Sequence, residues 1–309
     1  MVFQVIDDKK ECLGYFSNGK IRFRNPDESL TSTWDWSSSI KDLDVQLAKI
    51  YVNGKNISDA CPEHLKMRWE THEKRIKAHV RSFINSGVRI SDVCFYDLVP
   101  ERHVAHYYET LNEITEWILE NHERPTHYRL LHDTTIMCKE IGEQEVRVNW
   151  PLLKKHSRTD QKAFHIAQKY WEQRVSVRYN PYGTVTGRLG LEEGSFPILN
   201  FKKEIRDVIV PKWDGFVELD FNGAELRTLL HLSGHPQPTG DIHDFNQTSI
   251  FDDNISRADA KTKIFAWLYN PTSTAVDTEY YDKTKVLEEY YAEGVVTTPF
   301  GRKIPSDDF

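Results

Sequence analysis

The expected fold follows from residues 216–227, Phe-Val-Glu-Leu-Asp-Phe-Asn-Gly-Ala-Glu-Leu-Arg. Apolar residues at positions 217, 219 and 221 alternate with acidic residues at 218 and 220, and this period of two predicts a strand with one buried face. The Asn-Gly pair that follows breaks the strand. Leucines at helical spacing then predict a helix over residues 224–233.

Asp220 lies near the end of the predicted strand, on its more polar side. Strand ends often carry polar residues, so a solvated aspartate is the simplest interpretation of this residue alone. A carboxylate held there is also a suitable ligand for a divalent metal ion. The neighbouring motifs are needed to distinguish a solvated aspartate from a metal ligand.

Five stretches in order resemble the motifs of family A DNA polymerases, the group of bacterial polymerase I and many phage replicases. They are Thr186-Gly-Arg-Leu189, Asp220-Phe-Asn-Gly-Ala-Glu-Leu-Arg227, Asp241-Ile-His243, Arg257-Ala-Asp-Ala-Lys-Thr-Lys-Ile-Phe-Ala-Trp-Leu-Tyr269 and Thr297-Thr-Pro-Phe-Gly-Arg302. The resemblance implies an α+β fold of the polymerase right-hand type. A helical thumb-like region, an incomplete antiparallel β palm and helical fingers would follow a β-rich N-terminal region.

The expected division of the chain follows from these motifs and from the helical patterns before them. The predicted regions are a β-rich region over 1–60, a helical thumb-like region over 61–173, the first part of the palm over 174–238, fingers over 239–290 and a truncated return to the palm over 291–309. Apolar residues at helical spacing predict four helices, near residues 62–86, 100–122, 126–141 and 160–173.

The predicted fingers helix carries Arg257, Lys261, Phe265 and Tyr269 at steps of four residues. This spacing places all four on one face, with neighbouring side chains about 5–6 Å apart. The two cations suit the negative oxygens of a triphosphate, and the two aromatic rings suit a sugar and a base. The alternative is an ordinary amphipathic helix with solvated charges, which a face mixing cations with aromatic rings fits poorly.

The resemblance implies roles for further residues of this region. Lys261 would also protonate the pyrophosphate leaving group, and Phe265 is typical of members that discriminate against dideoxynucleotides. Glu225 would help to exclude a ribose 2′-OH, and His243 would lie on the phosphate side of the nucleotide. Phe221 would supply a main-chain carbonyl to the metal that Asp220 binds.

The candidate DNA-binding residues are Thr186, Arg188 and Arg206. Extended segments around a turn-rich stretch predict a β-hairpin leading to Arg188, and by resemblance this arginine touches the primer terminus. Charge supports a DNA contact, because residues 151–215 contain 12 Lys and Arg against 7 Asp and Glu, a balance of +5, whereas residues 216–309 contain 8 against 16, a balance of −8. A surface arginine and ordinary charge scatter are the alternatives.

Nucleotidyl transfer by two Mg²⁺ ions needs two carboxylates that bridge both ions. The family's second aspartate lies in a His-Asp hairpin of the palm, which is not found in these 309 residues. Asp307 and Asp308 lie at a terminus that we expect to fray. Three explanations stay open: a split polymerase completed by a second polypeptide, a fragment of a longer chain, or a decayed remnant.

The predicted function is template-directed 5′→3′ DNA synthesis with dNTPs, Mg²⁺ and primer-template DNA, completed by a second polypeptide; the 309 residues alone are expected to be inactive. A non-catalytic DNA-binding subunit is the alternative, but it would not need Asp220, Lys261 or Phe265. A free-standing nuclease would need a carboxylate cluster that the sequence does not offer.

Composition indicates a globular protein without a membrane span, since no apolar run reaches 18 residues. The first residues lack the features of a signal peptide, so the expected location is the cytoplasm. If a phage encodes the protein, this is the cytoplasm of the host cell. The cysteines at 12, 61, 94 and 138 form no CxxC pair and are predicted to be reduced. The N-terminal region lacks the Asp-x-Glu of a proofreading exonuclease, so we expect a structural or degenerate domain there.

Overall fold

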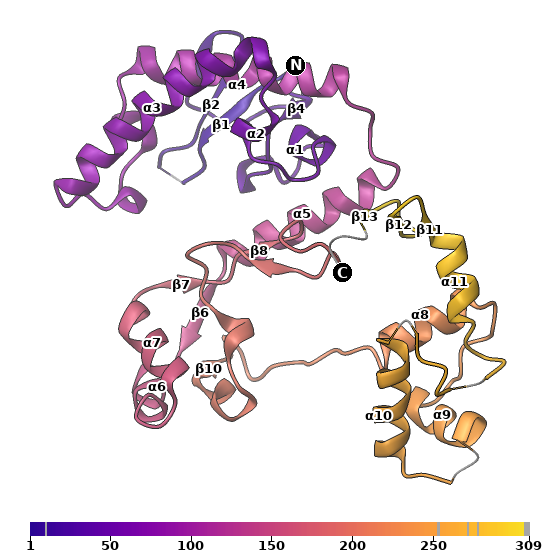
Figure 1. Cartoon of the computed structure of the whole chain (residues 1–309). Helices are drawn as coiled ribbons and strands as arrows, with labels where there is room; N and C mark the ends of the chain where they lie inside the picture. Colours follow the sequence, from indigo (N-terminus) through magenta and orange to yellow (C-terminus); the bar gives the residue numbers. More distant parts are fainter. Residues whose placement is uncertain (10, 252–253, 271, 277, 306–309) are drawn as a thin grey trace. The chain divides into compact units, whose positions relative to one another are not determined.

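The computed structural model describes residues 1–9, 11–251, 254–270, 272–276 and 278–305. The fold is mixed α and β, with several small sheets. The chain divides into two compact units, Met1–Val210 and Pro211–Phe309, which are labelled by element in Figure 1. The boundaries predicted at residues 60 and 238 do not coincide with this division. Among the described residues, no helix is long and apolar enough to cross a membrane.

The first unit begins with an antiparallel sheet of β1 (Gln4–Asp7), β2 (Gly14–Ser17) and β3 (Lys20–Arg22). Ser17 pairs with Lys20, so Asn18 and Gly19 form a two-residue turn, and both have the positive φ that such a turn requires, 48° and 70°. Asn-Gly is a typical sequence for this turn.

A parallel pair of short strands adjoins the first sheet. The strands are β4 (Ser32–Thr33) and β5 (Gln46–Leu47), and a parallel bridge between Val2 and Ser32 connects β4 to the chain just before β1. The spatial order is therefore β3-β2-β1-β4-β5.

Two long helices, α3 (Glu63–Asn85) and α4 (Glu101–Asn121), pack against each other and share a core with this sheet. Their bounds confirm the first two predicted helices. The core combines Phe16 of β2 with Trp69 of α3 and Ile114 of α4. The predicted boundary at residue 60 runs through this core, because neither the sheet nor the helices bury their apolar faces alone. The short elements here are η1 (Ser38–Ile40), α1 (Ala48–Tyr51), α2 (Ile57–Ala60), η2 (Ile90–Asp92) and η3 (Phe95–Asp97).

The prediction that all four cysteines are reduced is wrong. Cys12 and Cys94 form a disulfide across 82 residues of sequence, whereas Cys61 and Cys138 are free thiols. Sequence spacing could not reveal the pair, because the fold brings the turn after β1 beside the loop that follows α3.

The rest of the first unit continues with α5 (Tyr128–Glu143) and α7 (Gln161–Tyr170), which confirm the other two predicted helices. Its remaining elements are β6 (Glu145–Val148), α6 (Trp150–His156), β7 (Val175–Ser176), β8 (Tyr179–Asn180), β9 (Gly190–Leu191), η4 (Ile198–Asn200), η5 (Lys203–Val208) and β10 (Ile209–Val210). Strand β6 lies between β10 and β7, and β8 pairs with β9.

The second unit packs helices around an apolar core. Its helices are α8 (Ala224–Leu232), α9 (Ile242–Phe251), α10 (Arg257–Leu268) and α11 (Lys283–Tyr290). Leu226, Leu230, Ile242, Ile264 and Trp267 are buried between them. A small antiparallel sheet of β11 (Tyr291–Ala292), β12 (Val295–Thr297) and β13 (Lys303–Pro305) follows.

The strand predicted over residues 216–221 is not formed. This segment has no strand assignment, and its apolar side chains are exposed, by 87% at Val217, 91% at Leu219 and 80% at Phe221. A strand needs a hydrogen-bonding neighbour and a surface to cover its apolar face, and the described residues supply neither. The helix predicted just after it is confirmed as α8.

Candidate functional site

Helix α10 carries the predicted stripe of two cations and two aromatic residues. Ser256 caps the helix, since its Oγ accepts a hydrogen bond from the Asp259 N–H at 3.2 Å and donates to the Asp259 carboxylate at 2.7 Å. Ser256 and Asp259 therefore cap the helix together. Lys261 is exposed, and Phe265 is half-buried.

Arg257 lies at the start of α10 between two carboxylates. Its NH2 donates to Asp241 Oδ2 at 2.6 Å, and its Nε lies 3.0 Å from Asp244 Oδ1. Both aspartates belong to the N-terminal turn of α9 or the residue before it. These contacts connect the beginning of α10 to the beginning of α9, and they neutralise a cation that the sequence assigned to phosphate.

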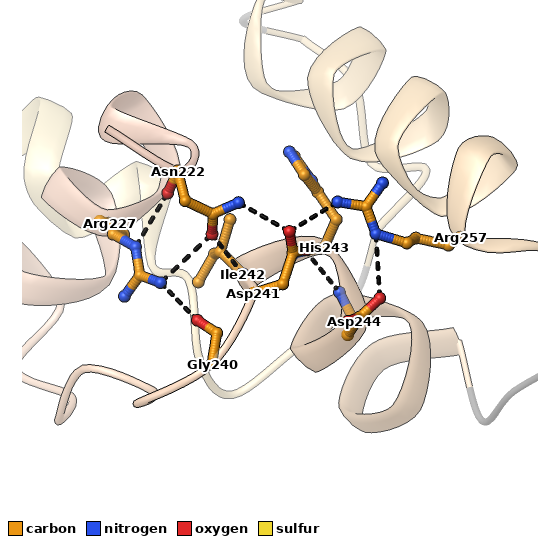
Figure 2. A network of polar contacts seen from close by, with 8 residues as sticks. All are labelled: Asn222, Arg227, Gly240, Asp241, Ile242, His243, Asp244 and Arg257. Atoms are coloured by element: carbon orange, nitrogen blue, oxygen red, sulfur yellow. Dashed lines mark hydrogen bonds and ion pairs between the residues drawn. The ribbon is translucent and has the colours of Figure 1, made fainter. Parts of the chain in front are cut away.

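Asp241 receives four hydrogen bonds and is the centre of this polar network, as Figure 2 shows. Besides Arg257, the donors are the main-chain N–H groups of His243 at 2.7 Å and Asp244 at 3.1 Å, and the side-chain amide of Asn222 at 2.7 Å. Partial burial favours the protonated carboxyl, but these donors outweigh it and hold the pKa of Asp241 far below its usual range. Asp241 is therefore a fixed anion.

Asn222 and Arg227 form the other half of the network (Figure 2). Asn222 Oδ1 accepts hydrogen bonds from the Ile242 N–H at 2.7 Å and from Arg227 at 3.2 Å. Arg227 also donates to the main-chain carbonyls of Asn222 at 2.8 Å and Gly240 at 2.6 Å. The residues just after Asp220 are thereby joined through Asp241 to the first residue of α10.

Gly223 occupies the left-handed conformation, with φ of 64°, and is the N-cap of α8. A Cβ atom on this residue would lie 2.5 Å from Ile242 Cγ2, closer than carbon atoms approach. The tight packing of α8 on α9 therefore leaves no room for a side chain at this position.

His243 is buried, with 4% of its surface exposed. Its ring centroid lies 5.7 Å from that of Phe265, and within the described residues its Nδ1 has no hydrogen-bond partner. Burial lowers the pKa of His243, the charges of Lys261 and Arg257 act in the same direction, and Asp241 opposes them. The neutral imidazole is therefore the favoured form at neutral pH.

The two aromatic residues of the stripe stack on each other. The rings of Phe265 and Tyr269 are 5.9 Å apart at an interplanar angle of 14°. The Tyr269 hydroxyl donates to Glu225 Oε1 at 3.4 Å, which places the predicted sugar-selecting carboxylate beside the aromatic end of the stripe. Six predicted residues, Glu225, His243, Arg257, Lys261, Phe265 and Tyr269, thus belong to one compact unit.

The predicted metal ligands Asp220 and Phe221 lie in the exposed segment that precedes Asn222. In the part of the chain that the structure describes, no three His, Cys, Asp or Glu side chains gather closely enough to hold a metal ion. A carboxylate and a main-chain carbonyl are nevertheless the hard oxygen ligands that Mg²⁺ prefers, and Mg²⁺ commonly uses one or two protein carboxylates together with substrate phosphates. The donors present therefore fit half of such a site, and Asp307 and Asp308 lie outside the described residues.

The candidate DNA-binding residues belong to the first unit. Thr186 and Arg188 are exposed in the loop between β8 and β9, where Gly187 has φ of 83° and Thr184 Oγ1 donates to the Arg188 carbonyl at 2.6 Å. The hairpin is formed by other residues than predicted: Tyr179 and Asn180 pair with Leu191 and Gly190, so Arg188 lies within its loop and not after it. Arg206 is exposed on η5, with its Nε 3.5 Å from the carbonyl of Phe201.

Sequence reasoning missed three members of the network, Asn222, Arg227 and Asp244. Asn222 was interpreted only as part of a strand break, and no role was predicted for Asp244. Only Asp241 offered a signal, because an aspartate before an apolar residue that begins a helix is a typical N-cap.

No protein-family model matches this chain, and no similar sequence is found among curated proteins.

Proposed function

We propose that this chain is the nucleotide-binding part of a template-directed DNA polymerase of the family A type, which needs a second carboxylate from residues outside those described. The observation that carries the proposal is the face of α10, where an exposed lysine and two stacked aromatic rings follow Arg257 at steps of four residues. Cations next to flat apolar surfaces are expected where a nucleoside triphosphate binds. They are not typical of a helix face that is only exposed to solvent.

The other residues of the unit support this assignment by their chemistry. Lys261 is exposed to receive phosphate oxygens, and Phe265 with Tyr269 offers a surface for the sugar and base. Glu225 is held by Tyr269 where a carboxylate would discriminate against a ribose 2′-OH. The neutral His243 ring packs beside Phe265 and is a hydrogen-bonding group rather than a fixed cation.

Asp220 and the Phe221 carbonyl would hold Mg²⁺ in this proposal. Bound Mg²⁺ neutralises the phosphate charge and activates the attacking hydroxyl. The contribution of the chain itself is to end the 216–221 segment at Asn222, which the polar network fixes beside α9. The exposed apolar residues of the segment suit a partner strand, and a strand that brings the second carboxylate would cover them.

The alternative is a non-catalytic primer-template-binding subunit or an inactive remnant. It is favoured by one observation: within the described residues, Asp220 belongs to no group of three His, Cys, Asp or Glu side chains that could hold a metal ion. Such a subunit would bind DNA through residues such as Arg188 without any use for the stripe on α10.

Primer extension distinguishes these functions. The 309-residue chain should bind primer-template DNA but extend it barely or not at all with Mg²⁺ and dNTPs. Two Mg²⁺ ions a few ångströms apart repel each other, and a single bridging carboxylate leaves transition-state charge uncompensated. The resulting deficit should be several powers of ten in rate. Adding a polypeptide with a His-Asp palm hairpin should restore extension, resolved on a gel.

The Asp220→Ala variant is the control for the restored activity, which it should abolish. Rapid extension by the 309 residues alone would mean that another carboxylate, such as Glu218, completes the metal site. Binding of primer-template DNA without extension in the presence of the second polypeptide would favour the non-catalytic alternative.

A further inference from the structure

The two cations of the stripe on α10 are in different states. Arg257 is bound by two carboxylates, at 2.6 Å and 3.0 Å. Lys261 is exposed and makes no hydrogen bond or ion pair within the residues that the structure describes. A ligand with several negative charges therefore meets one available cation and one that is already neutralised.

The two carboxylates around Arg257 differ in how firmly they are held. Asp241 has a side chain that is 26% exposed, and it accepts hydrogen bonds from three groups besides the arginine. Asp244 has a side chain that is 63% exposed, and among the described residues Arg257 is its side chain's one hydrogen-bond or ion-pair partner. Asp244 can therefore release the arginine by rotating into solvent, whereas Asp241 cannot leave without breaking the N-terminal turn of α9.

We propose that Asp244 sets the affinity of this site for nucleotide by competing with the phosphates for Arg257. The inference rests on the proposed function, because the competing ligand is the triphosphate of that site. A guanidinium binds a carboxylate and a phosphate through the same planar pair of N–H groups. Arg257 cannot turn its Nε group toward a phosphate while that group faces Asp244, so binding exchanges one anion for another.

This exchange has two consequences for binding affinity. A triphosphate carries more charge than one carboxylate, so it displaces Asp244 from Arg257. Its affinity is nevertheless reduced by the free energy needed to break the contact between Asp244 and Arg257. An exposed ion pair of this kind corresponds to about a two- to five-fold change in an equilibrium constant. A ligand that is too short to reach Arg257 does not break the contact, so its affinity should not depend on Asp244.

The experiment is a binding titration of the full 309-residue chain with Mg²⁺-dATP and, separately, with dAMP. The Asp244→Asn variant keeps the shape of the side chain and removes its charge. We expect it to bind dATP about two- to five-fold more tightly and to leave the affinity for dAMP unchanged. Asp244→Ser should behave in the same way, which guards against an effect peculiar to the amide.

Glu288→Gln is the matched control. Glu288 is an exposed acidic residue on α11 of the same unit, and no contact with Arg257 is found for it. Glu288→Gln removes the same unit of charge as Asp244→Asn. An equal gain in dATP affinity would therefore show that the net charge of the chain, and not the position of Asp244, determines the affinity. The thermal midpoint of each variant confirms that the fold is kept.

A double-mutant cycle with Arg257→Gln separates competition from simple repulsion. If Asp244 acts by occupying the arginine, the gain from Asp244→Asn disappears when Arg257 is absent. A gain of the same size in the Arg257→Gln background would overturn the competition model. Unchanged or weaker dATP binding by Asp244→Asn, with normal binding by the parent chain, would overturn it as well.

Failure of the proposed function gives a different result. If neither the parent chain nor Asp244→Asn binds dATP, the nucleotide site itself is refuted, and the role of Asp244 is refuted with it. Binding by the parent chain that is insensitive to Asp244 leaves the nucleotide site standing and removes only the competition.

Discussion

At the scale of single residues, the second unit depends on side chains that satisfy several main-chain groups at once. Asp241 caps α9 and also anchors Arg257 and Asn222, and Arg227 donates to three main-chain carbonyls. Such charge-assisted hydrogen bonds are stronger than neutral ones. They fix the residues after Asp220 and the start of α10 relative to each other, which a nucleotide site would require.

Lys261→Ala should weaken dNTP binding by several-fold or more and leave the affinity for primer-template DNA nearly unchanged. The reason is the loss of one charge-assisted contact to phosphate, made by a residue that lies on the stripe of α10. Lys263→Ala is the matched control, because it removes the same charge from the same helix but off the stripe. Equal losses of DNA and dNTP affinity in Lys261→Ala would assign this lysine to the DNA path instead.

Gly223→Ala should destabilise the second unit by about 1–3 kcal/mol, because a residue with a side chain is strained at this backbone conformation and its Cβ would lie 2.5 Å from Ile242. Gly234→Ala is the control: it has φ of 87° but open space around the added atom, so it measures the backbone strain alone. Urea denaturation of both variants gives the comparison. A cost at Gly223 no larger than at Gly234 would mean that α8 and α9 adjust to the extra atom.

At the scale of elements, a row of histidines connects α3 and α4. The ring of His72 lies 5.9 Å from that of His106, and the ring of His79 lies 5.7 Å from that of His103. Burial lowers the pKa of His72 and of His103, and neighbouring cations lower both further. The charged groups that act on His72 are His106, Arg75, Arg68 and His103. Those that act on His103 are Arg102, Arg75, His79 and His106.

The first unit should therefore lose stability in mild acid. The unfolded chain takes up protons on His72 and His103 near pH ~6.5, whereas the folded chain takes them up only at lower pH, because the pKa of each is lowered. The free energy of unfolding is then highest above that value and decreases as the pH falls through it. Urea midpoints at pH 7.5, 6.5 and 5.5 should show this decrease.

A variant with both His72→Gln and His103→Gln should lose part of that pH dependence. His165→Gln changes an exposed histidine of α7, outside this row, and should leave the dependence as it is. An identical pH profile in the double variant and the parent chain would contradict the assignment.

Helices were predicted far better from the sequence than strands. The apolar spacing in α3 and α4 and the Ser256 cap of α10 are local signals, so the bounds agree within a few residues. The segment 216–221 has an equally clear period of two, yet it is not a strand, because pairing depends on a neighbour that the pattern cannot supply. The Cys12–Cys94 disulfide and the contacts of Asp244 are non-local in the same sense.

At the scale of the whole molecule, the two units have separate cores. The residues that follow the division after Val210 expose large side chains, by 80% at Trp213 and 66% at Phe216. Exposed segments outside regular structure are the preferred sites of proteolysis. The same segment contains Asp220 and Phe221, the predicted metal ligands.

Brief treatment with chymotrypsin should cut first between residues 213 and 221, because its preferred aromatic and leucine side chains are exposed there. Mass spectrometry should find one product ending in this segment and one beginning in it. Slower digestion of the two products would agree with two separately folded cores. A first cut inside α3 or α10 would contradict the division.

The uncovered segment also affects the fate of the protein in a cell. Val217, Leu219 and Phe221 present exposed hydrophobic surface, which chaperones and degradative proteases recognise in the same way as a hydrophobic strand at an exposed sheet edge. Molecules whose segment is covered would survive longer than those whose segment stays bare. The steady-state amount of this chain would then follow the supply of whatever pairs with it, and not the rate of its own synthesis.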